Sequence, residues 1–229
     1  MSKSASVPSG PRDAPETAAR WTRRKDARPG EILDAALELF VARGFAATKV
    51  EDIARAAGVT AGTIYRYYAN KEDMLKAVIQ ESYERTYLEG DQLFAQFRGT
   101  GPELLAEVIR AWWRLVGSTR LSGLPKLMIA EAANFPELAQ FHREAVIERG
   151  EGYIARAIEY GIARGEFRPL PVDIAVKVVC APVVMAMIWR HAPLPCNAGD
   201  LDIERYLDEV IHTLIQGLAV RPAGSNPER

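Results

Sequence analysis

The chain has 229 residues, of which 48% are hydrophobic and 26% charged, so its composition fits a globular protein and excludes a disordered or fibrous one. Taken as a total, the net charge of -1 argues against a nucleic-acid-binding protein, because such domains usually carry a basic excess. The charge is unevenly spread, since twelve Lys and Arg face eight Asp and Glu up to Lys71 and the remainder is acidic. The split indicates either a basic module joined to an acidic one or chance unevenness in small counts.

The N-terminal segment is predicted to be a disordered tail over residues 1–27, because Ser, Pro, Gly and Ala dominate its beginning. It lacks the apolar stretch of a secretory signal. Its basic run Trp21–Lys25 is either a solvated charge run or an arm that reaches an adjacent minor groove of DNA.

Cysteines and apolar runs give a further expectation about location. Cys180 and Cys196 lack metal-binding spacing, so we expect neither a disulfide framework nor a zinc module, in a reducing cytoplasm. The apolar run Val178–Trp189 is interrupted by Pro182 and is shorter than the roughly 20 residues that span a bilayer. We therefore expect no transmembrane helix.

The first predicted helix begins at about Glu31 and ends at Gly44, with Pro29 suited to its first turn. Its apolar positions recur at helical spacing and are Ile32, Ala36, Leu39 and Phe40. Thr48 and Glu51 have the spacing of a capping box, which predicts a short second helix.

Two further caps predict the next two helices. Thr60 is positioned to cap a third helix, and Asn70, with Asp73 three residues later, a fourth. Further helices are predicted over residues 102–113, 125–134, 136–164, 173–191 and 201–219, each separated from the last by Pro or Gly. No segment alternates with a period of two, so the fold class is all-α, with roughly nine helices.

The segment from Glu51 to Tyr68 has the spacing of two helices that cross at a tight turn. Ala54 is small enough for the second helix to pass close, Gly58 can adopt the left-handed turn, and Ile64 fixes the second helix on the core. The pattern predicts a helix-turn-helix at about residues 49–68. Its second helix, residues 61–68, would be about 12 Å long, comparable with the width of the DNA major groove.

Residues 28–78 resemble the DNA-binding domain of the tetracycline-repressor (TetR/AcrR) family. The resemblance is carried by Ile32-Leu-x-Ala-Ala-x-x-Leu-Phe40, Gly44-Phe45, Ile53-Ala54, Ala57-Gly-Val-Thr60, Gly62-Thr-Ile-Tyr65-x-Tyr-Tyr68 and Asn70-Lys71-x-x-Met74-Leu75. It implies a homodimeric transcriptional regulator, usually a repressor, that binds a palindromic operator in the major groove. It also implies a three-helix DNA-binding domain at residues 28–88 and a larger helical domain at 89–229, which binds a small effector and dimerises through its last two helices.

The residues assigned to DNA binding by this resemblance are Thr48, Thr60, Ala61, Gly62, Thr63, Tyr65, Arg66, Tyr67 and Lys71. Lys71 combines a cation with a helix N-terminus and is expected to bind a phosphate. Tyr65 is expected to pack on a thymine methyl group and Arg66 to reach a guanine, whereas Tyr68 is assigned to the core.

The C-terminal domain holds large apolar side chains that could line an effector cavity or form plain core. The candidate lining residues are Phe97, Trp112, Trp113, Met128, Phe141, Tyr153, Met185 and Trp189, together with Phe94 and Met187. They favour an apolar or aromatic effector of unknown identity. The three histidines lack ligand-like spacing, so no metal and no cofactor are expected.

Two other functions fit parts of the sequence. Glu144 with Glu148, or Asp200 with Asp202 and Glu204, could in principle perform acid and base chemistry in a helical enzyme. No nucleophile or phosphate-loop motif accompanies them, so we do not expect an enzyme. The other alternative is an architectural DNA-binding protein that has no effector.

Overall fold

The computed structural model describes residues 16–192 and 199–220, with side chains from residue 29 onward. These residues are almost entirely helical, which confirms the all-α prediction, and their only β feature is an isolated bridge between Phe167 and Ala219. The α-helices are α1 (Glu16–Arg43), α2 (Val50–Ala56), α3 (Ala61–Tyr65), α4 (Lys71–Gln96), α5 (Gly101–Trp112), α6 (Leu124–Glu131), α7 (Pro136–His142), α8 (Glu148–Ala163), α9 (Val172–His191) and α10 (Ile203–Leu218).

Three short segments join some of these helices. The π-helical turn η1 (Trp113–Gly117) extends α5, and the 3₁₀ turn η2 (Arg120–Gly123) leads into α6. A second π-helical turn, η3 (Arg143–Ile147), connects α7 to α8 without a break. The predicted long helix from Pro136 to about residue 164 is therefore present, with a π turn inside it.

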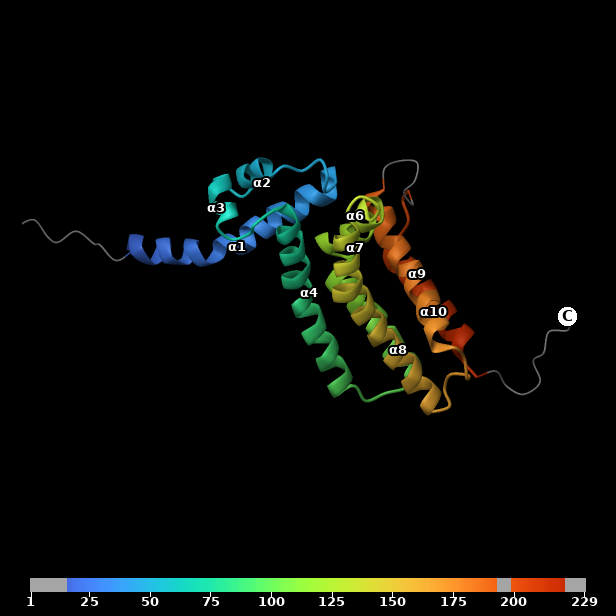
Figure 1. Cartoon of the computed structure of the whole chain (residues 1–229). Helices are drawn as coiled ribbons and strands as arrows, with labels where there is room; N and C mark the ends of the chain where they lie inside the picture. The colour runs from blue at the N-terminus through green and yellow to red at the C-terminus, as the bar shows by residue number, and fades with distance from the viewer. Residues whose placement is uncertain (1–15, 193–198, 221–229) are drawn as a thin grey trace, which may run out of the picture.

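Helix α1 begins much earlier than predicted. It starts at Glu16 and continues through Pro29, so the prediction of a disordered tail is wrong for residues 16–27, while residues 1–15 lie outside the described part of the chain. Ala, Arg, Glu and Lys have high helix propensity, which accounts for a helix without an apolar stripe. The first half of α1 projects beyond α3, and the basic run Trp21–Lys25 lies on it (Figure 1).

The N-terminal unit has one small core to which four helices each contribute a large side chain. Phe40 of α1, Ile53 of α2, Ile64 of α3 and Met74 of α4 are at most 1% exposed. Because close-packed cores tolerate little change in volume, these contacts fix the relative positions of α2 and α3.

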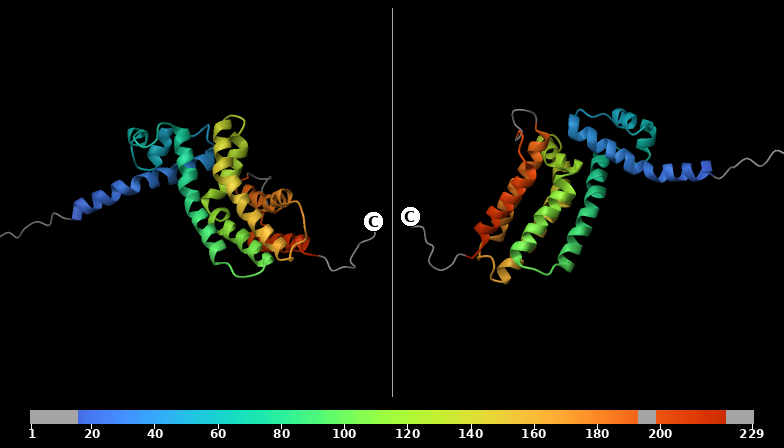
Figure 2. Two further views of the ribbon diagram at one scale, coloured as in Figure 1. Left: turned by 60° about the horizontal axis from the view of Figure 1, so that its bottom comes forward. Right: turned by 180° about the vertical axis from the view of Figure 1, so that it is seen from behind.

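The larger unit is a helical bundle in which α5 packs on α8 and α8 on α9. Ile109, Ile158 and Val183 are fully buried between these helices. Helix α4 starts in the N-terminal unit and runs down one side of the bundle, while α9 and α10 form the opposite side (Figures 1 and 2).

Helix α9 is longer and more apolar than the run Val178–Trp189 indicated. With 20 residues and a mean hydropathy of 2.0 it could cross a membrane by length and composition, so the length of the shorter run is no argument against a membrane-spanning helix. A core helix of a bundle has the same composition, and α9 packs against α6, α8 and α10. Ile174, Val178 and Met185 nevertheless remain 59%, 56% and 42% exposed on its outer face.

Candidate nucleic-acid interface and apolar cavity

The turn between α2 and α3 has the predicted geometry. Gly58 has a φ of +64°, in the left-handed region that glycine adopts without a Cβ clash. The Val59 N–H then donates to the Ala54 carbonyl at 2.9 Å, and Ile64 anchors α3 with 1% of its surface exposed. The side of α3 opposite Ile64 therefore faces outward.

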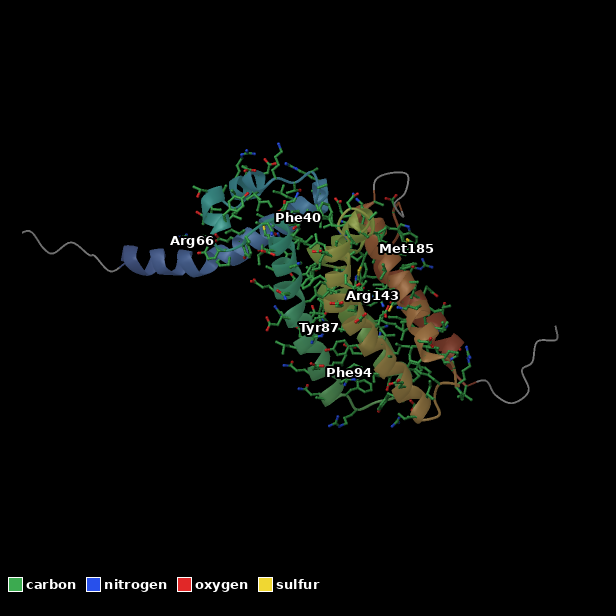
Figure 3. All side chains as sticks on the ribbon, viewed as in Figure 1. Phe40, Arg66, Tyr87, Phe94, Arg143 and Met185 are labelled. Carbon is green, nitrogen blue, oxygen red and sulfur yellow. The ribbon has the colours of Figure 1, made fainter. Side chains whose placement is uncertain are left out.

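We call residues 60–67 the α3 face. The predicted DNA contacts in this segment all reach the surface, wholly or in part: Thr60, Ala61, Gly62, Thr63, Tyr65, Arg66 and Tyr67. Tyr65 is 52% and Tyr67 39% exposed, and the Arg66 guanidinium lies 5.6 Å from the centre of the Tyr67 ring. Arg66 lies at the end of α3 in Figure 3. Tyr68 packs against the core, as predicted.

The regular part of α3 is shorter than the predicted helix over residues 61–68. It ends at Tyr65, and the N–H groups of Tyr67 and Tyr68 both donate to the Ile64 carbonyl, at 2.9 and 3.0 Å, in a closing turn. Thr60 caps the helix, because its hydroxyl accepts the Thr63 N–H at 3.2 Å. A five-residue helix rises only about 7.5 Å, so just its first turn can enter a groove deeply.

Lys71 has a different role from the predicted phosphate contact. Its ammonium donates to the carbonyl oxygens of Phe45, Thr48 and Ala46 at 2.6, 2.9 and 3.2 Å. Burial lowers the pKa of Lys71, although Glu131 opposes this shift. A lysine ammonium has three donors, and all three are engaged with the chain. The ammonium therefore supports the loop before α2, which contradicts its assignment to DNA.

The Thr48 side chain is also turned away from the surface. It is 1% exposed, and its hydroxyl lies 2.7 Å from the Gly44 carbonyl and 3.2 Å from that of Leu39. The N-cap of α2 is Lys49, which makes no side-chain capping bond, so the predicted capping box with Glu51 is wrong. The threonine closes the loop instead of contacting phosphate.

The same loop is held from the bundle by Glu131, at the end of α6. This carboxylate is 7% exposed and accepts the N–H groups of Phe45 and Ala46 at 3.0 and 3.1 Å. The Phe45 ring also meets the Phe135 ring edge-on, with 4.8 Å between centres. The loop at residues 44–48 is thus bound by Glu131 from one side and Lys71 from the other.

A cavity of about 380 Å³ lies inside the bundle, and most of its wall is apolar. Helix α4 contributes Tyr87 and Phe94, which lie beside α8 in Figure 3. Helix α6 contributes Met128, three residues before Glu131, and its C-cap Ala132, directly after Glu131, also lies on the wall. The helix that holds the loop before α2 therefore also forms part of the cavity wall.

Three of the eight predicted pocket residues line this cavity, namely Trp112, Met128 and Tyr153, as do Phe94 and Met187. The other five have different surroundings: Phe97, Trp113, Phe141, Met185 and Trp189 are absent from its wall. Phe97 packs edge-on against Tyr160 at the far end of α4, and Trp189 packs against Tyr206 of α10. Their assignment to the cavity is wrong because they face other neighbours.

The remaining three misassigned residues lie on the wrong side of their helices. Trp113 is buried against Gly117 and lies below the guanidinium of Arg190, 5.7 Å from its ring centre. Phe141 meets the ammonium of Lys76 at 5.9 Å, and Met185 is exposed on α9. Helical spacing alone does not say which side faces a cavity.

Polar wall residues were missed by the sequence analysis. Tyr87 donates to the Ala145 carbonyl at 2.5 Å, and burial raises its pKa to about 12. His142 is 5% exposed, and burial lowers its pKa to about 4. Only the aromatic character of Tyr87 could have suggested it, and nothing in the sequence marks His142.

The wall carries no uncompensated charge. Glu151, on the wall, is paired with Lys177, and burial raises the pKa of the free thiol Cys180 to about 12. Tyr153 donates to the Tyr87 carbonyl at 3.0 Å and to Asp91 at 2.9 Å. Cys196 lies outside the described residues.

Three of the five carboxylates considered for catalysis have structural partners. Glu148 pairs with Arg143 at 3.1 Å, Glu144 accepts from Gln140, and Asp202 caps α10. Within the described part of the chain, no group of three or more His, Cys, Asp or Glu could hold a metal ion. His191 lies 2.8 Å from the Ser122 hydroxyl, as a satisfied side chain.

Two family models match most of the chain. The model of bacterial regulatory proteins of the tetR family matches residues 32–78, and that of the tetracyclin repressor-like C-terminal domain matches residues 103–210. The chain is 40% identical to the HTH-type transcriptional repressor KstR2 of Rhodococcus jostii, over 86% of this chain and 94% of that protein. It is 31% identical to the fatty acid metabolism regulator protein of Bacillus subtilis, over 82% of this chain and 94% of the relative.

Solved structures have the same fold. FadR from Bacillus subtilis in complex with stearoyl-CoA has a TM-score of 0.66 at 24% identity, covering 82% of this chain and 98% of its own. A regulator from Saccharomonospora viridis in complex with choline has a TM-score of 0.70 at 17% identity, covering 86% and 100%. The chain therefore belongs to the tetR family of bacterial regulatory proteins and is a DNA-binding transcriptional repressor of the helix-turn-helix type, not an enzyme.

Proposed function

We propose that the chain is a cytoplasmic homodimeric repressor that binds a palindromic operator through the α3 face and leaves it when a small apolar or aromatic effector occupies the cavity. The observation that carries this proposal is the position of α6. Its Glu131 holds the loop before α2, while its Met128 belongs to the cavity wall. One short helix therefore touches both the candidate effector site and the DNA-binding unit.

The DNA contacts divide into two groups. Ala61, Gly62 and Tyr65 meet base edges, and Arg66 reaches a base or a phosphate from the end of α3. Thr60, Thr63 and Tyr67 position the helix on the phosphate backbone. Thr48 and Lys71 are left out, because the chain itself engages their side chains.

The domain division keeps a DNA-binding unit at residues 28–88 and an effector-binding and dimerisation unit at 89–229. Helix α4 belongs to both, because its first turn packs in the small core and Tyr83, Tyr87 and Phe94 line the cavity. The projecting part of α1 carries the basic run Trp21–Lys25, and the salt dependence of operator affinity with residues 1–26 removed decides between an arm on neighbouring DNA and a solvated charge run.

Dimerisation involves α9 and α10, and on α9 Ile174, Val178 and Met185 form an exposed apolar strip. Burying such a strip against its copy is the ordinary basis of a two-fold interface. We expect the variant Val178→Glu to be a monomer by light scattering and to bind the operator weakly. A dimer of unchanged stability in this variant would place the interface elsewhere.

The names of the relatives support an effector with an apolar part. Relatives are named as regulators of fatty acid metabolism, and one solved structure contains stearoyl-CoA. Another relative of known structure is called a ketosteroid transcriptional regulator. The aromatic and aliphatic wall of the present cavity suits ligands of that general character.

The experiment that tests the proposed function is selection of bound genomic fragments by the full-length protein. A palindrome is expected, with half-site centres about 34 to 36 Å apart along the DNA. Tyr65→Ala should lower operator affinity about 10- to 100-fold, because a base contact is lost in each half-site. The control is Tyr160→Phe, far from α3, where the hydroxyl donates to the Gly99 carbonyl.

Other outcomes would reject parts of the proposal. Sequence-independent binding that Tyr65→Ala leaves unchanged would contradict operator recognition by the α3 face. An architectural DNA-binding protein remains the outcome if a broad metabolite panel neither raises the melting temperature nor weakens operator binding.

A further inference from the structure

His142, a residue of the cavity wall, has a buried ring nitrogen without a hydrogen-bond partner among the described residues. His142 is 5% exposed and lines the cavity, and among the described residues its Nε2 is a buried polar atom without a hydrogen-bond partner. Burial of a polar group without a hydrogen bond costs free energy, so native proteins pair most such atoms with protein, water or ligand. An unpaired ring nitrogen on a residue that lines an apolar cavity thus points to a polar group of a ligand in that cavity.

A π-helical turn that lines the cavity follows His142 along the chain. His142 is the last residue of α7, and the π-helical turn η3 follows it directly. Val146 and Ile147 of η3 line the cavity, and so do Leu115 and Val116 of the other π turn, η1. Single π turns inside α-helices are frequent at functional sites, because the wide turn redirects side chains. Both π turns of the described chain therefore form cavity wall.

Neighbouring polar groups on the wall are already engaged. The Tyr87 hydroxyl donates to the Ala145 carbonyl within η3, and the Tyr153 hydroxyl is shared between Asp91 and the Tyr87 carbonyl. Glu151 is paired with Lys177. Because these groups already have partners, the buried Nε2 of His142 is the wall atom that can still form a hydrogen bond with a ligand.

We propose that the cavity binds an uncharged, mostly apolar ligand with one hydroxyl or carbonyl group, and that this group forms a hydrogen bond with His142. This inference rests on the proposed function, because it identifies the chemical class of the effector for the same cavity. A hydroxyl satisfies either tautomer of a neutral imidazole, since it can both donate and accept. A carbonyl satisfies the tautomer that carries the proton on Nε2.

The wall offers no free counter-ion to an ionic head group. No Lys or Arg lines the cavity, and its one acidic residue, Glu151, is already paired with Lys177. A buried ion without a partner costs far more than a buried hydroxyl that is hydrogen-bonded. The five aromatic side chains Tyr83, Tyr87, Phe94, Trp112 and Tyr153 favour a ligand with a ring.

Isothermal titration of the full-length protein with a matched set of probes tests this inference. The probes are 4-hexylphenol, hexylbenzene without the hydroxyl, 4-hexylbenzoate with a charge in its place, and dodecanoyl-CoA. We expect 4-hexylphenol to bind about 5- to 10-fold tighter than hexylbenzene, which is the effect of one neutral hydrogen bond. The benzoate should bind more weakly than the phenol.

Variants locate the effect at His142. His142→Phe should remove the preference for the phenol while retaining binding of hexylbenzene, and His142→Asn should restore part of the preference. His212→Asn, on the exposed side of α10, is the control for loss of a histidine and should leave the preference intact.

The outcomes separate this inference from the proposed function. Equal preference for the phenol in wild type and His142→Phe, or tighter binding of the benzoate or dodecanoyl-CoA, overturns the ligand class and leaves an effector cavity. Absence of binding by every probe overturns the inference. Probes that bind yet do not weaken operator binding in a separate titration contradict the proposed release mechanism, while the contact with His142 stands.

Discussion

The α3 face and the cavity are built in opposite ways. The α3 face consists of exposed side chains on a five-residue helix, fixed by one buried residue, Ile64, and one glycine turn at Gly58. The cavity is lined by side chains from α4 to α9 and from the π turns η1 and η3, which meet only in the folded bundle. Local interactions determine the α3 face, whereas long-range packing determines the cavity. Substitutions should therefore affect DNA binding and ligand binding separately.

The largest expected effect comes from two neighbouring positions on α3. Ile64→Ala should lower the free energy of unfolding by about 2 to 5 kcal/mol, because Ile64 is buried among all the N-terminal helices. Tyr65→Ala, at a residue 52% exposed, should leave stability within about 0.5 kcal/mol while weakening operator binding. Urea unfolding of both variants measures this. Equal losses of stability would mean that the α3 face is part of the core.

The next largest effect is a loss of stability at low pH caused by His142 on the cavity wall. His142 has a folded-state pKa of about 4 against 6.5 for the ordinary group, so between these values the unfolded chain binds a proton that the folded chain does not. The contribution of His142 to the free energy of unfolding should therefore change little above pH 6.5. Between pH 7.5 and pH 5 it should lower that free energy by about 2 kcal/mol. The measurement is the difference in urea unfolding between wild type and His142→Phe at both pH values. An identical pH dependence in both proteins would show that His142 has the same pKa in the folded and the unfolded chain.

A smaller effect is expected at the junction between the two regions. Glu131→Gln keeps an oxygen for the N–H groups of Phe45 and Ala46 but removes the charge, which should cost about 1.5 kcal/mol. The same variant should respond less to effector in operator titrations, because the loop before α2 is held less firmly. The control is Glu144→Gln, an exposed carboxylate on η3. An unchanged effector response would exclude Glu131 from the coupling.

The smallest expected effects come from two glycines with open space around them. Gly58→Ala should destabilise the protein by about 1 kcal/mol, because its φ of +64° strains any residue with a Cβ. Gly152→Ala, inside α8, should stabilise it by about 0.5 kcal/mol or more. Melting temperatures should move in opposite directions. A gain in stability at Gly58 would contradict the left-handed turn.

The sequence could predict features that depend on neighbours along the chain. The caps of α3 and α4, Thr60 and Asn70, accept N–H groups three residues later, and the glycine turn at Gly58 is equally local. The family resemblance then identified the DNA-binding unit, which the family models confirm. Thr48 and Lys71 were misassigned because their partners lie on other elements or across a loop.

For the cavity, the sequence could predict the types of side chain that line it but not which individual residues do. Trp112 and Trp113 are adjacent, yet the first lines the cavity and the second packs below Arg190. Met185 and Met187 differ by two positions on α9, and only Met187 faces inward. The orientation of each helix about its own axis decides these cases, and that orientation depends on contacts with the whole bundle.

Helix α4 connects the loop before α2 to the cavity, so a tilt of this helix would move the loop. Its first residue, Lys71, holds the loop before α2, and Tyr87 touches the cavity sixteen residues later, about 24 Å away at the usual rise per residue. A tilt of only about 5° around the cavity end would carry the other end sideways by about 2 Å. In a two-fold dimer the displacement doubles, to about 4 Å between the two DNA-binding units. If the proposed dimer releases its operator in this way, a ligand that widens the cavity by less than the diameter of one atom would be enough to take both units out of step with the helical repeat of DNA.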